Sequence, residues 1–253
     1  MLECDPAEKD FLSAELWEWG STGIVELSES RLRAFFEDSA DASALLEEFA
    51  RHGARLEQHE PRDWVEVSRS GWKPISVGSR FFLVPEWLDD PAPTGRFRIA
   101  INPGMAFGTG YHEATQLCLE ALERDLKPGM RVLDIGTGAG LLSQAAHLLG
   151  AGRVWGCDVD PTAVEIAARK VPLVFTGSVD AVASESMDLI VANISAAAAI
   201  ALAPDVFRCL RPGGTGLLSG FERDEVPAVQ AALGGRPPEM HCKNSWCLLK
   251  VNR

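Results

Sequence analysis

Apolar positions in the first sixty residues change from a helical to an alternating period and back. The pattern predicts five elements in chain order: a helix over residues 6–19, strands over 24–27 and 31–36, a helix over 41–52 and a short strand over 55–59. Asp41 is suited to cap the second helix, and Gly53 ends it. This order predicts a small α+β unit of the ferredoxin-like kind, with only a stub of its first strand.

From Arg96 onward, buried strands alternate with amphipathic helices, which is the pattern of a parallel α/β sheet. Strands are predicted at 131–135, 154–157, 173–175, 188–192, 216–219 and 246–251, and helices at 115–125, 141–149, 161–170 and 199–210. The predicted fold class is therefore α/β, with a doubly wound and mostly parallel sheet beside the smaller N-terminal unit.

A segment of different composition lies between these two patterns. It combines three tryptophans with several prolines, and short strands are predicted within it at 75–77 and 80–84. We therefore predict three parts: a small α+β domain over residues 1–60, a connecting segment over 61–95 and the α/β domain over 96–253.

Charge is distributed unevenly along the chain. The formal net charge is −12, and residues 1–60 hold 15 acids but only 5 lysines and arginines. A nucleic-acid-binding surface is usually basic, so we expect no direct contact with nucleic acid. An acidic domain attracts a basic macromolecule through complementary potential, whereas a solvated surface that serves solubility is the alternative interpretation.

Apolar runs and cysteines indicate the compartment and the redox state. The start Met-Leu-Glu-Cys-Asp lacks the regions of a signal peptide, and the Ala-rich run 194–203 is too short to span a bilayer. We therefore expect a cytoplasmic protein that contacts no membrane, and we expect a monomer. The six cysteines form no CxxC pair and no zinc-type cluster, so we expect buried, reduced thiols and no metal site.

The strongest chemical signal is the stretch 132–140, Val-Leu-Asp-Ile-Gly-Thr-Gly-Ala-Gly. A buried strand runs into Gly136, Gly138 and a third glycine, and then into a helix. Glycine lets the backbone approach a ligand closely, and this turn lies where doubly wound sheets bind ligands. A dinucleotide fingerprint needs its third glycine one residue later, where this chain has Leu141. The spacing instead resembles the S-adenosylmethionine-binding motif of class I methyltransferases.

Three further segments place chemical groups at the same predicted edge. Asp158 ends the next strand, where a carboxylate can accept hydrogen bonds from both hydroxyls of a ribose. The glycine-rich loop around Phe107 precedes a helix and is suited to a lid over a cofactor. Asn193 ends an apolar strand and offers an acceptor and two donors to an amine or to the cofactor. A helix cap for Asp158 and a plain turn residue for Asn193 are the structural alternatives.

Together these segments resemble one family. The glycine-rich loop, the 132–138 strand turn, Asp158 and Val-Ala-Asn193-Ile are similar to those of PrmA, bacterial methyltransferases of large-subunit ribosomal protein eleven. The likeness extends to Trp17-Glu-Trp-Gly in the small domain and to Ser245-Trp246-Cys247 near the end. It implies methyl transfer from S-adenosylmethionine to lysine side chains and the N-terminal amine of that basic protein, which the acidic domain would dock.

The resemblance also implies roles for individual residues. The cofactor-binding residues expected from it are Thr115, Gly136, Asp158 and Asn193, and the glycine turn and the loop before the helix add Gly138 and Phe107 as expected contacts. Asn193 is also the expected catalytic residue, which would orient an amine whose pKa is lowered by desolvation. His112 is a candidate general base, but the sequence shows no partner for it, and a hydrogen-bonded loop histidine is the alternative.

The chain departs from the family pattern at several positions. The first of two paired threonines is Ala114, a connecting-segment tryptophan is Ser68, Lys170 replaces an asparagine, and residues are missing before Val174. Because the shortened 171–175 region and the reduced first strand bear on the substrate, a methyltransferase of the same fold that acts on another protein lysine or a small amine is the alternative. A nicotinamide-dependent oxidoreductase and a non-catalytic binding protein are further alternatives; the glycine spacing argues against the first and the intact cofactor residues against the second.

Overall fold

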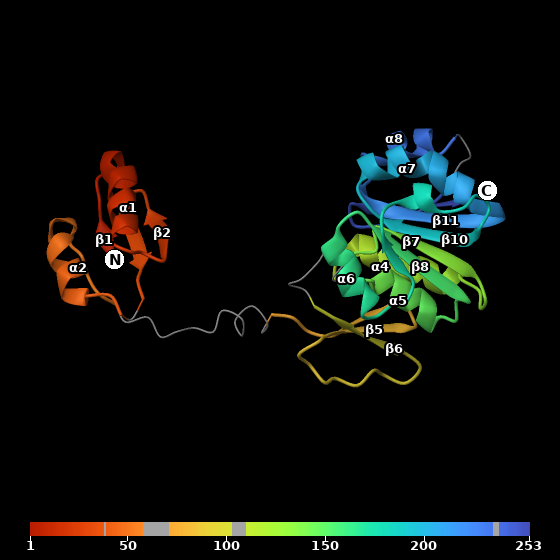
Figure 1. The fold of residues 1–253 in the computed structure, drawn as a ribbon, viewed down its shortest axis with the longest axis horizontal. Coiled ribbons are helices and arrows are strands. Elements are labelled where there is room, and N and C mark those ends of the chain that lie inside the picture. The colour runs from red at the N-terminus through yellow and green to blue at the C-terminus, as the bar shows by residue number, and fades with distance from the viewer. Residues whose placement is uncertain (38, 58–70, 103–109, 235–237) are drawn as a thin grey trace. The chain divides into compact units, whose positions relative to one another are not determined.

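A computed structural model describes residues 1–37, 39–57, 71–102, 110–234 and 238–253. The chain divides into two compact units, Met1–Arg69 and Ser70–Arg253 (Figure 1). The strands predicted near 75–77 and 80–84 are present as β4 (Ile75–Val77) and β5 (Phe81–Pro85), and they belong to the second unit. Part of the segment that the sequence places between the domains is therefore built into the larger one.

The first unit is a small helix-covered sheet. Its elements are β1 (Leu2–Glu3), a 3-10 turn (Pro6–Glu8), α1 (Lys9–Glu18), β2 (Gly23–Ser28), β3 (Arg31–Phe35), α2 (Ala42–Glu48) and a second 3-10 turn (Ala50–His52). The strands pair antiparallel in the order β1-β3-β2, and Leu16 and Phe49 pack with the buried Leu32. As predicted, Asp41 caps α2 and β1 is only a stub. Residues 55–57 of the predicted closing strand are not a strand, although Arg55 and Met1 exchange two backbone hydrogen bonds.

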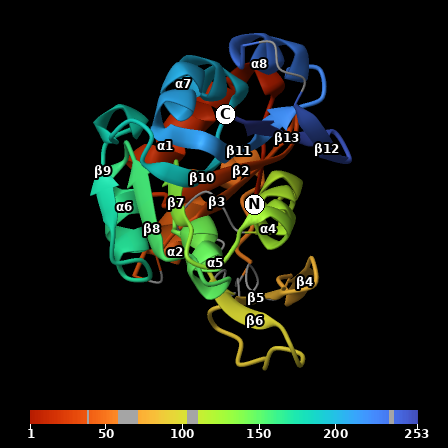
Figure 2. The same cartoon turned by 90° about the vertical axis from the view of Figure 1, so that its right-hand side faces the viewer.

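The second unit is organised around a seven-stranded sheet. Its elements after β5 are β6 (Phe97–Ile101), α4 (Glu113–Asp125), β7 (Arg131–Ile135), α5 (Leu141–Leu148), β8 (Arg153–Asp158), α6 (Pro161–Ala168), β9 (Val174–Thr176), β10 (Met187–Asn193), α7 (Ala196–Cys209), β11 (Leu210–Glu222), α8 (Val226–Ala232), β12 (Glu239–Lys243) and β13 (Trp246–Asn252). The strand order is β12-β13-β11-β10-β7-β8-β9, and Figure 2 shows these strands from the right-hand side of Figure 1. All pairs from β11 to β9 are parallel, and β13 runs antiparallel to both neighbours. The predicted doubly wound, mostly parallel sheet is confirmed.

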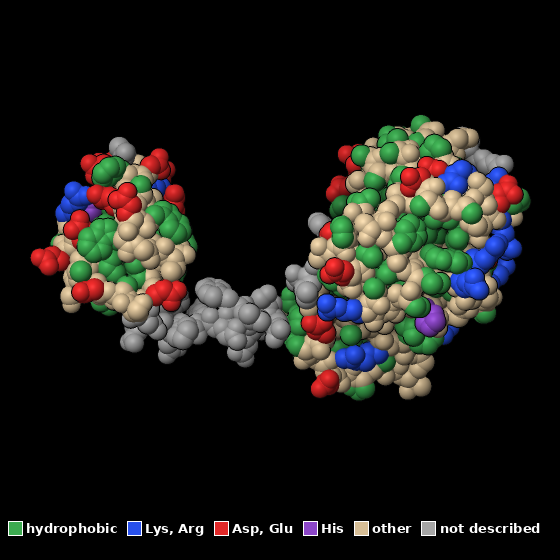
Figure 3. All heavy atoms as spheres, in the orientation of Figure 1, with side chains coloured by type: hydrophobic (Ala, Val, Ile, Leu, Met, Phe, Trp, Pro, Cys, Tyr) green, Lys and Arg blue, Asp and Glu red, His purple; other side chains and the backbone are tan. Residues whose placement is uncertain are grey.

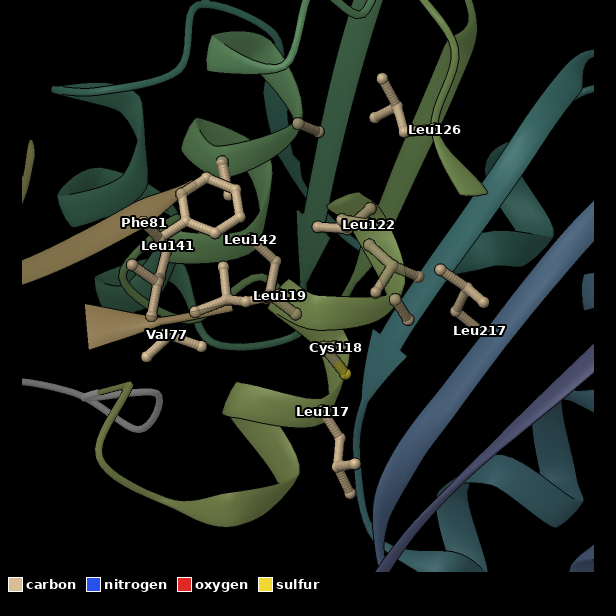
Figure 4. Close-up of a cluster of buried hydrophobic side chains, with 14 of the residues drawn as sticks. Val77, Phe81, Leu117, Cys118, Leu119, Leu122, Leu126, Leu141, Leu142 and Leu217 are labelled. Carbon is tan, nitrogen blue, oxygen red and sulfur yellow. The ribbon is translucent and has the colours of Figure 1, made fainter. Parts of the chain in front are cut away.

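Helices cover both faces of this sheet. Helices α4 and α5 pack on one face and α7 and α8 on the other, each over its own buried cluster (Figure 1). The first cluster also includes the small sheet β4-β5-β6, whose Phe81 and Leu83 are fully buried. Figure 4 shows Phe81 beside Leu141 and Leu142 of α5, with Leu119 of α4 close by. The small sheet therefore extends the core beneath the helix that carries Thr115. Within the described residues, none of the helices is long and apolar enough to cross a membrane.

The cysteines differ in part from the prediction. Four of them, Cys4, Cys118, Cys157 and Cys209, are buried free thiols as expected. Cys242 and Cys247 instead form a disulfide, with their Cα atoms 4.1 Å apart. The two residues lie directly opposite each other in the antiparallel β12–β13 pair. The expectation of six reduced thiols was wrong because the search for CxxC spacing does not detect partners that strand register brings together.

Candidate functional site

The predicted site residues meet at one edge of the large sheet. The central strands β7 and β10 pair in register up to Ile135 and Ala192, and the strand order reverses between them. The residues that follow these strands, together with the end of β8, therefore lie side by side. Ligands bind at such a reversal point outside the carboxyl ends of the strands.

The glycine turn after β7 requires glycine for two separate reasons. Gly136 and Gly138 have φ angles of +68° and +52°, in the left-handed region that other residues rarely adopt. A Cβ at Gly136 would also lie 2.7 Å from Cγ2 of Ile194, the residue after Asn193. The N–H groups of Gly136 and Thr137 donate to the carbonyl oxygen of Cys157 at 2.9 and 3.0 Å. The turn is thus fixed against the ends of both neighbouring strands.

Asp158 holds this turn from the end of β8. Its Oδ2 accepts the backbone N–H of Gly138 at 2.9 Å, and its Oδ1 accepts the N–H of Asp160 at 3.1 Å. Asp160, in turn, caps α6 by accepting the N–H of Thr162 at 2.8 Å. Each carboxylate oxygen has two lone-pair sites, so Asp158 retains acceptor capacity for further donors.

Thr115 and Asn193 form a hydrogen-bonded pair, although 78 residues separate them. The Nδ2 atom of Asn193 donates to Oγ1 of Thr115 at 3.0 Å. Thr115 is almost fully buried in the first turn of α4, and Asn193 is half-buried at the end of β10. The pair therefore joins α4 to the end of β10.

His112 has a structural partner that the sequence did not reveal. Its Nδ1 accepts the backbone N–H of Ala114 at 3.3 Å and so caps α4. Its ring meets that of Trp246 edge-on, with ring centroids 4.3 Å apart. Because the capping nitrogen must carry a lone pair, the structure favours the hydrogen-bonded loop histidine over a general base that uses Nδ1.

A buried carboxylate that sequence analysis missed lies beneath the glycine turn. Asp134 of β7 is fully buried, and its Oδ2 accepts hydrogen bonds from Thr137 Oγ1 at 2.8 Å, Ser143 Oγ at 2.7 Å and Ser143 N at 2.9 Å. Its Oδ1 is buried without a partner among the described residues. Burial raises the pKa of Asp134 to about 6 against the three donors, which lower it. Only its place in the Val-Leu-Asp-Ile strand could have signalled this role.

The cofactor contact of Phe107 and the absence of a metal site are the remaining expectations about ligands. Phe107 lies outside them, so its predicted cofactor contact stays a prediction. Among the residues that are described, no group of three histidine, cysteine or acidic side chains could hold a metal ion. The polar groups at this edge of the sheet are the Thr115–Asn193 pair and Asp158, which is bonded to Gly138 of the turn.

Comparison with known proteins agrees with this geometry. The profile of the family "Ribosomal protein L11 methyltransferase (PrmA)" matches residues 8–253. The chain belongs to this family. A ribosomal protein L11 methyltransferase from Dechloromonas aromatica is 39% identical over 229 residues, which cover 85% of this chain and 76% of that protein. One from Symbiobacterium thermophilum is 37% identical over 239 residues, or 92% and 77% of the two chains.

A solved structure supports the PrmA assignment at the level of the fold. The ribosomal protein L11 methylase from Lactobacillus delbrueckii subsp. bulgaricus superposes with a TM-score of 0.66 at 29% sequence identity. The match covers 72% of this chain and 99% of that one. The fold of this chain is therefore similar to that of a solved PrmA-family protein, and the resemblance inferred from the sequence motifs is confirmed.

Proposed function

We propose that this PrmA-family chain transfers methyl groups from S-adenosylmethionine to amines of ribosomal protein L11. The observation that carries the proposal is the Thr115–Asn193 pair beside the glycine turn, at the point where the strand order reverses. The relatives that match most of this chain are named for that substrate.

The residues present fit the cofactor. The turn at Gly136 and Gly138 brings bare backbone to the sheet edge, where a ligand can lie against it. Asp158 has spare acceptor sites for two ribose hydroxyls, because each of its oxygens accepts only one backbone N–H. Thr115 is placed beside Asn193 and completes the set, with Phe107 as a further expected contact from the preceding loop.

The chemistry divides between the cofactor and the chain. When bound, S-adenosylmethionine supplies a methyl group on a positively charged sulfur, and its neutral thioether product needs no acid. The chain has to supply a neutral amine in the right place, and burial of an ammonium at the sheet edge lowers its pKa. Since Asn193 Nδ2 donates to Thr115, its Oδ1 remains as the acceptor that orients an N–H of the substrate amine.

The first unit is proposed to dock the substrate protein. Acidic side chains are spread over the face of this unit that Figure 3 shows, in keeping with the excess of acids in residues 1–60. In the same unit, Phe11 and Trp17 of α1 are 66% and 55% exposed. Aromatic faces and carboxylates together suit lysine-rich and arginine-rich surfaces. These features support a basic substrate protein such as L11, whose lysine side chains and N-terminal amine are the acceptors that we propose.

A different acceptor is the alternative, namely another protein lysine or a small amine. Lys170, where the family has asparagine, directly precedes the shortened 171–175 region, and burial lowers the pKa of its amine while Glu86 raises it. A comparison of L11, a lysine-rich unrelated protein and free lysine as substrates separates these cases. Preferential methylation of L11 supports the proposal, and preference for either of the others moves the substrate elsewhere.

Cofactor binding is tested separately from the substrate. We expect Asp158→Ala to weaken S-adenosylmethionine binding in equilibrium dialysis by about 10-fold or more, because hydrogen bonds to a charged group contribute about 1.5–3 kcal/mol. The matched control is Asp205→Ala, which removes a carboxylate from α7, on the face of the sheet opposite α4 and α5. Equal affinities for the two variants would contradict the role of Asp158.

A further inference from the structure

Near the end of the chain, the β12–β13 hairpin contacts the start of α4, which carries Thr115, and it pairs with β11, the strand beside Asn193. Its tip, residues 243–246, is a two-residue turn closed by the paired Lys243 and Trp246. The Cys242–Cys247 disulfide lies directly behind the tip. Asn244 has a φ angle of +53°, which asparagine tolerates better than most residues. The tip is therefore a short, cross-linked structure of fixed shape.

Three contacts join the hairpin tip to the first turns of α4. Lys243 Nζ donates to Gln116 Oε1 at 2.6 Å, and Asn244 Nδ2 donates to Glu113 Oε1 at 2.9 Å. The Trp246 ring packs edge-on against His112, the residue that caps the helix. Gln116 also reaches back through Nε2 to the carbonyl oxygen of Tyr111 at 2.9 Å. The residues on both sides of Thr115 are thus held by the same hairpin.

A second route joins the hairpin to Asn193. Ser219 of β11 donates through Oγ to the carbonyl oxygen of Cys247 at 2.8 Å. The carbonyl oxygen of Ser219 accepts the N–H of Ile194 at 2.9 Å, and Ser219 is the register partner of Asn193. Ser219 is completely buried, so these bonds are shielded from water. The end of β10 is therefore tied to the residue that follows Trp246.

We propose that the hairpin tip is a clamp that positions the Thr115–Asn193 pair, with Trp246 and Lys243 as positioning residues. Thr115 and Asn193 come from elements far apart in sequence; the hairpin contacts α4 directly and reaches β10 through β11. A loosened tip releases the first turn of α4 while β10 stays in the sheet, so the distance between the two side chains changes. The consequence for methyl transfer rests on the proposed function of Asn193.

The first test uses a readout that is independent of activity. Hydrogen exchange of the Asn193 side-chain amide is measured by NMR in the full chain, with the signal identified by its loss in Asn193→Ala. We expect Trp246→Leu and Lys243→Met to speed this exchange about 10-fold or more, because exchange requires the hydrogen bond to open. Met240→Ala, an exposed change on β12, is the control. Unchanged exchange in both clamp variants would overturn the proposal.

Lys243→Met keeps the test decisive if Trp246→Leu does not fold. The Lys243 side chain is 40% exposed, so its replacement leaves no buried cavity. It removes the contacts with Gln116 and with Glu120, whose Oε1 lies 3.3 Å from Nζ. An Asn193 amide that exchanges at the wild-type rate in this folded variant is evidence against the clamp.

A second test asks whether the clamp acts through Asn193. For methylation of L11, we expect Lys243→Met to lower kcat about 10-fold in the wild-type background, since small misplacements of reacting groups have large effects. In the Asn193→Ala background the same change should have almost no effect. A full 10-fold loss in both backgrounds contradicts the clamp. If the wild-type chain does not methylate L11, the proposed function fails, and the exchange measurement alone decides on the clamp.

Discussion

We predict that Asp134 makes the stability of the fold depend on pH. This carboxylate lies fully buried under the glycine turn, and three donors from Thr137 and Ser143 converge on one of its oxygens. Burial disfavours its charged form more than the donors favour it, which raises its pKa from 3.8 to about 6. The charge of Asp158 acts in the same direction. Asp134→Asn removes this titration while it keeps the shape of the side chain.

The magnitude follows from the difference between the folded and unfolded pKa values. A tenfold change in acid dissociation is worth about 1.4 kcal/mol, so a rise from 3.8 to about 6 corresponds to about 3 kcal/mol. Between these pH values the folded state holds a proton that the unfolded state has released. The free energy of unfolding of the wild type therefore falls as pH rises through this window, and the full loss is reached above about pH 6.

Urea unfolding of the wild type and of Asp134→Asn at several pH values tests this reasoning. We expect the difference in unfolding free energy between them to change by about 2.5 kcal/mol between about pH 4 and about pH 7.5, because the unfolded carboxyl is already partly ionised at pH 4; the variant gains relative to the wild type as pH rises. Asp89→Asn, at an exposed position, controls for the loss of one acidic group. A difference that is the same at both pH values, within about 0.5 kcal/mol, would refute the argument.

Three substitutions near the site are expected to lower the free energy of unfolding by different amounts. Gly136→Ala should lower the free energy of unfolding by about 1–3 kcal/mol, because φ is +68° and the new Cβ meets a side-chain methyl of Ile194. Gly220→Ala should lower the free energy of unfolding clearly more than Gly136→Ala, because its Cβ would lie 2.4 Å from the backbone oxygen of Ile194, which cannot move aside. Thermal unfolding of both variants compares the two losses. A larger loss for Gly136→Ala would be inconsistent with these contacts. Asp160→Ala should remove the cap of α6 at a loss of about 1 kcal/mol, measured by urea unfolding, and an unchanged midpoint would exclude that role.

The parts of the fold that the sequence predicted are those with local signals. Buried parallel strands such as Arg131–Ile135 are continuous apolar runs, and helices such as α6 carry their own cap in Asp160. The prediction missed β6 and β12, because Phe97–Ile101 includes an arginine and Glu239–Lys243 is mostly polar. Both strands depend on pairing partners for their identity rather than on their own composition.

For the candidate site, too, the sequence revealed the residues with local signals but not the contacts between them. The motif residues Gly136, Asp158 and Asn193 could be found because each follows a recognisable strand. Their contacts could not, because the Thr115–Asn193 bond joins residues that only the sheet order brings together. The disulfide at Cys247 required knowledge of strand register, and the capping role of His112 required the start of α4.

Methyl transfer to ribosomal protein L11 is measured by intact-mass spectrometry of the unmethylated protein. The protein is incubated with this chain and S-adenosylmethionine, and in parallel with the Asn193→Ala variant, whose cofactor binding is measured beside it. We expect mass increases in steps of one methyl group with the wild type, and a loss of about 100-fold or more in rate for the variant. No mass change with the wild type while the cofactor still binds would contradict L11 as the substrate, and equal rates for the two proteins would contradict the role of Asn193.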